Sequence, residues 1–523
     1  MKPLMKSRSY LIYIFLFIYL VLNLSFLVDF PFVHSDESWL SGLARNITNH
    51  HDFSVTEPFF DLKDRYPHAI KSVFHGIQIL FMRAIGYNIF SMRLISLIFG
   101  VLSLYYVYKL AMALWGKENI ALGALLLTSF DIQFIYASHF ARQEIILVFV
   151  LVLCLYLFFK NKNEINTKHS TKTAVLLGCI IGLSIGVHPN SFIISLPLLF
   201  LYVYHIFISK RLALRSLLYF LITISGFAIL FIGLSFSFDP SFITHYKTLG
   251  QDFQVFNPLS AKLVQFKLFY LKLFYQISGT YYTPNIRFQF FFFPLILLVS
   301  LGLTCIKNKN TGYLLLSIAA LNLGLILIGR YNQTSVVFQF PLLYLLASYC
   351  IYSLPRLKAY LRQVILGFVV LTLGVLSVFN ITPYLTSVHG NSYENYLLQI
   401  GKVVSPEAEV LANLNTEYYF ELGKLHDYRN LSYLKDKNIA FAEYIKAENI
   451  EYILYPEEMD VIYEERPRWN GMYGTLVYYE EMKEYLEKNC RLIYEFSAPI
   501  YGMRIVDYLG KKDWQVKIYQ VNT

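Results

Sequence analysis

The chain has 523 residues, of which 56% are hydrophobic and 17% aromatic, whereas only 15% are charged. Its mean hydropathy of +0.46 excludes an ordinary soluble domain and predicts apolar runs that cross a membrane. Residues 1–383 contain 30 basic and 13 acidic side chains, whereas residues 384–523 contain 15 basic and 22 acidic ones. This division predicts a basic membrane part followed by a mildly acidic soluble part. It argues against a nucleic-acid-binding protein, because the basic residues flank apolar runs.

Apolar runs of membrane-spanning length recur throughout residues 1–383. They predict a polytopic α-helical membrane protein with about eleven transmembrane helices. The expected spans are 10–28, 90–113, 119–137, 143–159, 173–189, 191–208, 216–236, 288–306, 312–329, 336–354 and 363–383.

Basic residues cluster in alternate short connections between these spans. The positive-inside rule places such connections in the cytoplasm together with the basic N-terminus. An odd number of spans then puts residues 384–523 on the extracytoplasmic side. We therefore expect an integral membrane protein, located in the plasma membrane if the source is prokaryotic, whose acidic loops and C-terminus face the exterior. The basic positions are Lys117, Lys160, Lys162, Lys168, Lys172, Lys210, Arg211, Arg215, Lys307, Lys309, Arg356, Lys358 and Arg362.

Two external loops are long enough to carry structure of their own. The first, about 29–89, contains apolar residues at helical spacing between Pro67 and Ile85, followed by Gly86. This pattern predicts an amphipathic helix that lies in the membrane interface. The second loop, about 237–287, contains lysines among aromatic residues at 263–272 and is also expected to be interfacial.

Residues 384–523 alternate short apolar strands with amphipathic helices, which predicts a soluble extracytoplasmic α/β domain. At about 140 residues, this segment is long enough to bury a core of its own. Strands are expected at 409–412, 452–455 and 491–496, helices at 439–448 and 480–489, and a hairpin between 501–508 and 514–521.

The acidic residues of the membrane part are concentrated in the first external loop. Of the 13 in residues 1–383, seven lie between Asp29 and Asp64. The adjacent pair Asp36-Glu37 stands just after the first span, with Trp39 suited to the headgroup layer. A solvated acidic loop is the plain alternative. A pair of carboxylates at the membrane surface is the interpretation that the other polar residues favour.

A second group of polar residues is predicted to meet the same face of the membrane. Arginine, histidine and glutamate in a short turn between spans are costly there without partners. An interfacial Arg–Glu pair that closes a helical hairpin, or a proline turn with a histidine, would explain them without any function. The candidates for binding a donor or its phosphate are Arg142, Glu144, His139, Lys71, Arg65, His188 and Arg330.

Together these residues supply a carboxylate that takes a proton from an acceptor hydroxyl and cations that neutralise a departing phosphate. A lipid phosphate lies at the same depth. The sequence therefore predicts group transfer from a lipid-phosphate carrier. The two carboxylates also leave a divalent metal open as a cofactor, although the sequence contains no complete ligand set.

A first span followed by Asp36-Glu37, a long amphipathic first loop, and the turn Ala141-Arg142-Gln143-Glu144 resemble the GT-C glycosyltransferases. The closest resemblance is to the protein O-mannosyltransferase and aminoarabinose-transferase branch, and it covers residues 1 to about 210. It implies an inverting transferase that uses a polyprenyl-phosphate sugar and a lipid, glycan or protein acceptor. Asp36 would be the base and Glu37 its neighbour in orienting the acceptor or tuning the pKa, while Arg142 and Glu144 would lie in the donor site. The segment at 65–68 departs from the Lys-Pro-Pro-like turn of the aminoarabinose branch.

Three other classes compete with a transferase of this kind. A transporter or flippase of a polar or lipid-linked substrate would favour ionisable residues at mid-membrane and an inverted repeat, whereas the polar residues here gather at one face. A lipid-linked glycan polymerase or ligase would not explain the C-terminal domain or the position of Asp36-Glu37. A scaffold without enzymatic activity is the remaining alternative.

The charge pattern makes the topology testable. In a protein without its native cysteines, a cysteine introduced at position 309 should react with membrane-impermeant maleimide only after the cells are broken. A cysteine in the loop around Asp36 should react in intact cells, because that loop is expected outside. Labelling of position 309 in intact cells would contradict the predicted orientation.

Overall fold

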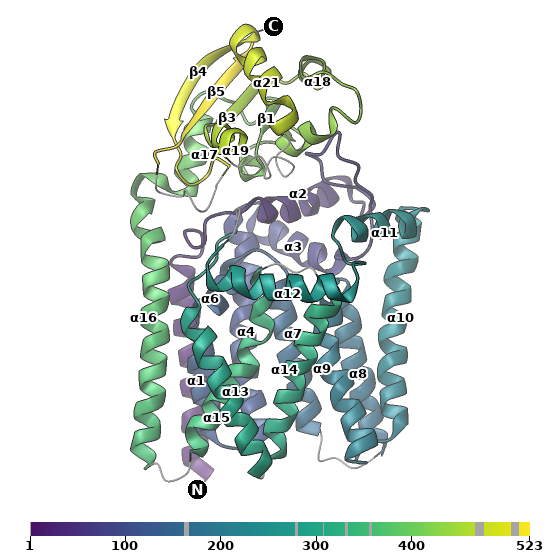
Figure 1. Ribbon diagram of the computed structural model, residues 1–523, viewed down its shortest axis with the longest axis vertical. Helices are drawn as coiled ribbons and strands as arrows, with labels where there is room; N and C mark the ends of the chain where they lie inside the picture. The colour runs from purple at the N-terminus through teal and green to yellow at the C-terminus, as the bar shows by residue number, and fades with distance from the viewer. Residues whose placement is uncertain are drawn as a thin grey trace.

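The computed structural model describes residues 2–161, 167–277, 281–306, 308–329, 333–354, 358–465, 475–503 and 512–522. Long helices form a bundle, and a smaller domain with a β-sheet covers one end of it (Figure 1). The N-terminus lies at the opposite end of the bundle from this domain (Figure 1). The predicted combination of a helical membrane part and a C-terminal α/β part is therefore confirmed in outline.

Each span expected from the sequence overlaps helix in the structure. The apolar composition explains this, because a helix satisfies all its backbone hydrogen bonds within one segment. The bundle helices are α1 (Lys2–Leu24), α4 (Ile89–Trp115), α5 (Glu118–Ser129), α6 (Ile132–His139), α7 (Glu144–Asn161), α8 (Thr167–Ile185), α9 (Ser191–Val203) with the π-helix η1 (Tyr204–Ile208), α10 (Leu214–Phe238), α13 (Arg287–Ile306), α14 (Lys309–Ile328), the 3₁₀-helix η2 (Gln333–Phe338), α15 (Phe340–Ser353) and α16 (Ala359–Asn391).

Six stretches of helix in the described part of the chain are long and apolar enough to cross a membrane. The bent pair α5 and α6 makes a seventh if it counts as one span. Other apolar helices, at 10–24, 171–185 and 287–302, fall short of this length. The predicted total of about eleven spans stays a prediction beyond these six or seven.

The span expected at 119–137 is not continuous. It bends by 65° between α5 and α6, where the side chain of Asp131 caps α6 by accepting a hydrogen bond from the backbone N–H of Phe134 at 2.8 Å. The other carboxylate oxygen of Asp131 accepts hydrogen bonds from Gln289 and Tyr344, both at 2.7 Å. The buried Asp131 carboxylate thus has three hydrogen-bond partners, and one of them is a backbone N–H that the break in the helix leaves without a helical partner.

The first external loop contains two helices, α2 (Ser35–His50) and α3 (Ser72–Ile85). The expected helix therefore starts at Ser72 and not at Pro67, because Lys71 has a left-handed backbone conformation with φ of 85°. It ends at Gly86 as expected, where the positive φ of 106° suits a glycine. Helix α2 is a correction, since the sequence predicted no helix around Asp36.

The second external loop also folds into helices, α11 (Phe242–Asp252) and α12 (Leu259–Phe274). Figure 1 shows α12 lying across the ends of the bundle helices, beneath α3. This orientation agrees with an interfacial helix that has lysines among aromatic side chains.

The C-terminal domain contains one five-stranded sheet of order β2-β1-β3-β5-β4. Strand β1 is parallel to β2 and β3, whereas β5 is antiparallel to β3 and β4. The elements are α17 (Tyr393–Gly401), β1 (Val410–Ala412), η3 (Leu414–Thr416), β2 (Leu425–Asp427), η4 (Tyr428–Tyr433), α18 (Phe441–Ala447), β3 (Tyr452–Pro456), α19 (Glu458–Glu465), α21 (Thr475–Asn489), β4 (Cys490–Ser497) and β5 (Gln515–Val521).

The predicted strands and helices of this domain largely agree with the structure, apart from the hairpin and β2. Strand β5 matches the predicted segment 514–521, but it pairs with β4 along 490–497. Residues 501–503 are not in a strand, and residues 504–508 lie outside the described residues. Strand β2 has only three residues, which is too short for alternation to be recognised.

The core of the C-terminal domain includes side chains from the first external loop. Phe32, Val33, Phe59 and Phe60 are buried in one cluster with apolar residues of β1, β3 and β5. The carbonyl oxygen of Phe59 accepts hydrogen bonds from the backbone N–H of Asp427 and from the side-chain amide of Asn430. The division into residues 1–383 and 384–523 thus follows the chain, while the hydrophobic packing joins the first loop to the C-terminal domain.

Candidate active site

Glu37 forms a fully buried ion pair with Arg93 at the start of α4. Nε and Nη2 of Arg93 each donate to one oxygen of the Glu37 carboxylate at 2.8 Å, and both side chains have no exposed surface. The same carboxylate accepts hydrogen bonds from the backbone of His34 at 2.8 Å and of Ala141 at 3.0 Å. Arg93 also donates to the carbonyl oxygens of residues 27 and 28. The Glu37–Arg93 pair thus joins the segment after α1, α2, α4 and the turn before α7.

Asp36, one residue earlier on α2, points to a different set of partners. Its Oδ2 atom accepts hydrogen bonds from Nη1 of Arg142 and from the hydroxyl of Tyr281. Arg142 also donates to the Tyr281 hydroxyl at 2.9 Å. About a fifth of the Asp36 side chain is exposed, namely 22%. Asp36, Arg142 and Tyr281 therefore form a partly open triad contributed by three separate segments.

His34 completes the surroundings of Asp36. Its Nδ1 atom accepts a hydrogen bond from the backbone N–H of Asp36 at 2.9 Å and so caps α2. Its ring stacks on Tyr281 with a centroid distance of 4.1 Å. Oδ1 of Asp36 lies 3.6 Å from Nδ1 of His34. This leaves Oδ1 as the carboxylate oxygen that faces neither Arg142 nor Tyr281.

The charges around Asp36 decide its ionisation. Burial by itself raises the pKa of Asp36, but Arg142, then His34, the Tyr281 hydrogen bond and Arg429 together hold it well below its ordinary value. The Asp36 carboxylate is therefore ionised at neutral pH.

Arg142 has a second carboxylate partner in Glu144. Nη2 of Arg142 lies 3.3 Å from Oε1 of Glu144, which also accepts a hydrogen bond from Thr334 at 2.8 Å. Nε of Arg142 and Oε2 of Glu144 are buried and make no hydrogen bond within the part of the chain that is described. These two groups are the polar atoms that a bound ligand would satisfy.

Lys71 and His188 lie near enough to Arg142 for its charge to act on both of them. The backbone N–H of Phe74 donates to the carbonyl oxygen of Gly186 at 3.1 Å, which holds the start of α3 against the turn that carries His188. A Cβ atom on Gly186 would lie 2.4 Å from Val73, so this approach requires glycine. Burial, followed by the charges of Lys71 and Arg142, keeps the pKa of His188 well below its ordinary value. His188 is therefore neutral.

Burial and neighbouring cations also lower the pKa of Lys71. Burial, then Arg65 and Arg142, lower the pKa of Lys71 to about 8. Lys71 also has the left-handed backbone conformation noted above, which an L-residue adopts only when its surroundings enforce it. An anion beside Lys71 and Arg142 would relieve this repulsion.

Arg65 is already paired with a carboxylate. Its Nε and Nη2 atoms donate to the two oxygens of Glu57 at 2.8 and 2.7 Å. Glu57 also accepts a hydrogen bond from the indole N–H of Trp39 at 2.6 Å. Arg65 therefore lines the site as half of an ion pair.

His139 is held by contacts outside this group. His139 is fully buried, and its Nδ1 and Nε2 atoms lie 3.0 Å from the carbonyl oxygen of Phe30 and 2.8 Å from the side-chain oxygen of Asn23. It connects the end of α1 to α6 and has no access to a donor. Arg330 lies outside the described residues.

The carboxylate pair does not fit a divalent metal in this arrangement. Both oxygens of Glu37 are engaged by Arg93 and the backbone, and Oδ2 of Asp36 is engaged by Arg142 and Tyr281. One remaining oxygen is not a ligand set. A second acidic group, Asp61 and Glu448 with His426, has ligand atoms within 4.8 Å of one another, but His426 there hydrogen-bonds to Asp61.

Three residues of the site were not expected from the sequence. Arg93 carried a weak signal, since it is an arginine inside an apolar run. Tyr281 and Arg429 carried none, because single polar residues in a loop and in a soluble domain are ordinary. Their roles depend on long-range contacts with α2.

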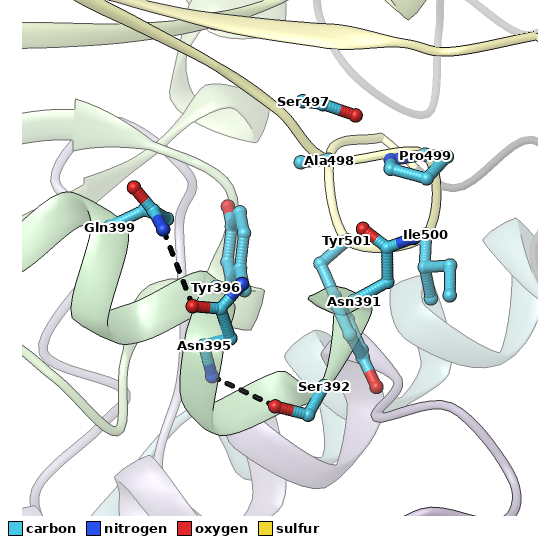
Figure 2. Close-up of a pocket in the computed structure, with 10 residues that line it drawn as sticks. All are labelled: Asn391, Ser392, Asn395, Tyr396, Gln399, Ser497, Ala498, Pro499, Ile500 and Tyr501. Atoms are coloured by element: carbon cyan, nitrogen blue, oxygen red, sulfur yellow. Dashed lines mark hydrogen bonds between the residues drawn. The ribbon is translucent and has the colours of Figure 1, made fainter. Parts of the chain in front are cut away.

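A separate small pocket lies at the start of α17 (Figure 2). It measures about 210 Å³, counted with the solvent at its mouth. Its lining is uncharged, and Figure 2 shows the two hydrogen bonds by which Asn395 joins Ser392 and Gln399. The remaining lining residues are Asn391, Tyr396, Ser497, Ala498, Pro499, Ile500 and Tyr501. None of the predicted site residues belongs to this pocket.

The chain is similar in sequence to a known family over about a third of its length. Residues 77–248 match the family model described as dolichyl-phosphate-mannose-protein mannosyltransferase. This range includes Arg142, Glu144 and His188 and begins after Asp36. No curated protein sequence matches the chain.

Solved structures show the same fold. ArnT from Cupriavidus metallidurans superimposes with a TM-score of 0.54 in the apo state, at 13% identity over 79% of this chain and 84% of that chain. Its complex with undecaprenyl phosphate gives a TM-score of 0.52 with the same coverage. The oligosaccharyltransferase AglB from Archaeoglobus fulgidus, in complex with an inhibitory peptide and a dolichol-phosphate, gives 0.52 at 15% identity, over 87% of this chain and 70% of that chain.

These comparisons confirm the resemblance inferred from the sequence. The chain has the GT-C fold of polyprenyl-phosphate-sugar glycosyltransferases, and the family match agrees with this fold. The class of protein that they indicate is a membrane glycosyltransferase.

The buried pair makes a prediction about Glu37. Glu37→Gln removes the negative charge opposite Arg93 and should lower the free energy of unfolding by about 3–5 kcal/mol, because it leaves a buried cation unpaired. Thermal melting of the purified protein measures this loss. Glu407→Gln, the same substitution at an exposed position, should leave the melting temperature unchanged. Wild-type melting combined with lost activity would instead place Glu37 in the chemistry.

Proposed function

We propose that this chain transfers a sugar from a polyprenyl-phosphate carrier to an acceptor hydroxyl at the external membrane face, with Asp36 as the base. The observation that carries the proposal is the triad of Asp36, Arg142 and Tyr281, in which an ionised carboxylate adjoins a cation cluster. The GT-C fold and the family match support the choice of donor.

The reaction has one displacement step. The acceptor oxygen attacks the anomeric carbon of the sugar, and the bond from that carbon to the phosphate oxygen breaks. The electron pair of the broken bond leaves with the polyprenyl phosphate, and the acceptor proton passes to Oδ1 of Asp36. Attack opposite the leaving group inverts the anomeric carbon.

Arg142 and Lys71 bind the donor phosphate in this proposal. Nε of Arg142 is buried without a hydrogen bond, and a phosphate beside Lys71 would relieve the repulsion between the two cations. The phosphate also draws Arg142 away from Asp36. Since Arg142 holds the pKa of Asp36 low, donor binding makes Asp36 a stronger base when it is needed.

Tyr281 holds Asp36 in place before the reaction. Its hydroxyl donates to Oδ2 while its ring stacks on His34, so the carboxylate cannot rotate freely. This leaves Oδ1 turned toward the acceptor. Glu37 acts as a positioning residue through Arg93 and the backbone of His34.

Removing the base tests the proposal directly. Asp36→Asn keeps the shape of the side chain but not its basicity, so turnover should fall by roughly 10²-fold or more. The assay follows release of polyprenyl phosphate by the reconstituted protein from a panel of undecaprenyl- and dolichyl-phosphate sugars. Asp52→Asn, which changes an exposed aspartate of the same loop, should retain wild-type turnover. Comparable rates in the wild type and Asp36→Asn would place the base elsewhere.

The titration of Lys71 predicts how kcat/KM for the donor changes at alkaline pH. Because its pKa is lowered to about 8, Lys71 loses its proton above that pH and stops attracting the phosphate. The kcat/KM for the donor should therefore decline above about pH 8, by up to about tenfold per pH unit. Lys71→Arg should move this decline to higher pH, since arginine stays charged. Lys267→Arg, at an exposed position on α12, should not shift the profile; a shift there, or none for Lys71→Arg, would reject the assignment.

A further inference from the structure

Three cations surround the indole of Trp39, next to Asp36 on α2. Nζ of Lys63 lies 4.6 Å from the ring centroid, and the guanidinium carbons of Arg429 and Arg65 lie 5.0 and 5.2 Å from it. Lys63 and Arg65 come from the first external loop, whereas Arg429 comes from the C-terminal domain. We call this group the Trp39 cluster.

Carboxylates only partly balance the charge of the Trp39 cluster. Glu57 binds both Arg65 and the Trp39 indole, so Arg65 already has a carboxylate partner. In the described part of the chain, Nζ of Lys63 contacts only the rings of Trp39 and Phe60. Burial, then Arg65 and Arg429, lower the pKa of Lys63 to about 8, which shows how close the cations are.

Arg429 has donor capacity that the protein does not use. Its Nη2 atom donates to Oγ of Ser35 at 3.1 Å. Its Nη1 atom is buried without a hydrogen bond, and Oδ1 of Asp427 lies 3.6 Å away. Burial raises the pKa of Asp427 despite this arginine. A guanidinium next to Ser35 with an unsatisfied N–H is suited to an external anion.

The Trp39 cluster and the proposed donor side flank Asp36. Arg142 hydrogen-bonds to Asp36 on one side, while Arg429 reaches the adjacent Ser35 on the other. The Glu57–Arg65 ion pair carries the charge that acts on both Lys71 and Lys63. Arg65 thus acts on both groups, whereas Arg429 belongs only to the Trp39 cluster, where it lies beside Ser35.

A phosphate matches this arrangement better than a carboxylate does. One guanidinium satisfies one carboxylate, as Arg65 and Glu57 show here. Lys63 and Arg429 instead approach from different segments, and a phosphate offers oxygens in several directions. We propose that Lys63 and Arg429 bind a phosphate group carried by the acceptor, beside the hydroxyl that Asp36 deprotonates. The inference rests on the proposed function, and it gives the C-terminal domain a direct part in acceptor selection.

Binding of simple phosphates to the full-length protein in detergent tests this inference without a sugar donor. The probe is dihexanoyl phosphatidic acid, and dihexanoylglycerol is its uncharged counterpart. The wild type should bind the phosphatidic acid and not the glycerol lipid. Lys63→Gln together with Arg429→Gln should weaken binding by about tenfold or more, because each loses a charge-assisted contact.

Lys437→Gln is the matched control. Lys437 also belongs to the C-terminal domain and pairs with Asp64 of the first loop at 3.1 Å, but both side chains are substantially exposed. Its affinity for the probe should stay within about twofold of the wild type. Lys63→Gln alone, at a partly exposed loop position, should weaken binding even if the double variant folds poorly.

Several results would overturn the inference: no binding by the wild type, equal binding of dihexanoylglycerol, or unchanged affinity in the Lys63 and Arg429 variants. A comparison with glycerol 3-phosphate distinguishes the source of the phosphate. Similar affinities indicate a soluble acceptor, and tighter binding of the phosphatidic acid indicates a lipid-borne one. Since the assay needs no turnover, its failure is separable from failure of the Asp36→Asn test.

Discussion

The buried ion pair between Glu37 and Arg93 is the constraint on which the site depends. Neither side chain has exposed surface, so each charge requires the other, and removal of either partner is costly. The pair and its backbone contacts connect four segments: the turn after α1, α2, α4 and the turn before α7. Successive residues of an α-helix point about 100° apart. With Glu37 held in the interior, Asp36 must point in another direction, where Arg142 and Tyr281 meet it.

The charges around Asp36 control both its ionisation and its strength as a base. Asp36 is kept ionised by Arg142 and its neighbours in spite of burial, which makes it ready to accept a proton but weakly basic while Arg142 holds it. The neutral His188 adds shape without adding charge. In the proposed reaction, a donor phosphate that competes for Arg142 would therefore couple donor binding to the base strength of Asp36.

The C-terminal domain is attached to the first external loop by more than chain connectivity. Apolar loop residues, among them Phe59, belong to the core of the domain. Polar contacts add to this: His426 lies 2.7 Å from Asp61 and 3.0 Å from Glu409, and Arg45 lies 3.2 Å from Glu417. Burial raises the pKa of Glu417 to about 7, which indicates how dry this interface is. The surface next to Asp36 is thus built jointly by the loop and the domain.

The sequence by itself determined the helical membrane part and the α/β character of the C-terminal domain, and it proposed Asp36 and Arg142, which the structure brings together. Hydropathy and charge are local properties of the sequence. The spacing of apolar residues and the position of an acidic pair can therefore be recognised without knowing the fold. Only the tertiary structure decided that Glu37 is an anchor, that α2 is a helix and that Arg65 is paired with Glu57. It also brought in Arg93, Tyr281 and Arg429, which lie 56, 245 and 394 residues from their partners on α2. Such contacts depend on how separate segments pack, and a lone arginine or tyrosine carries no local pattern that reveals its partner.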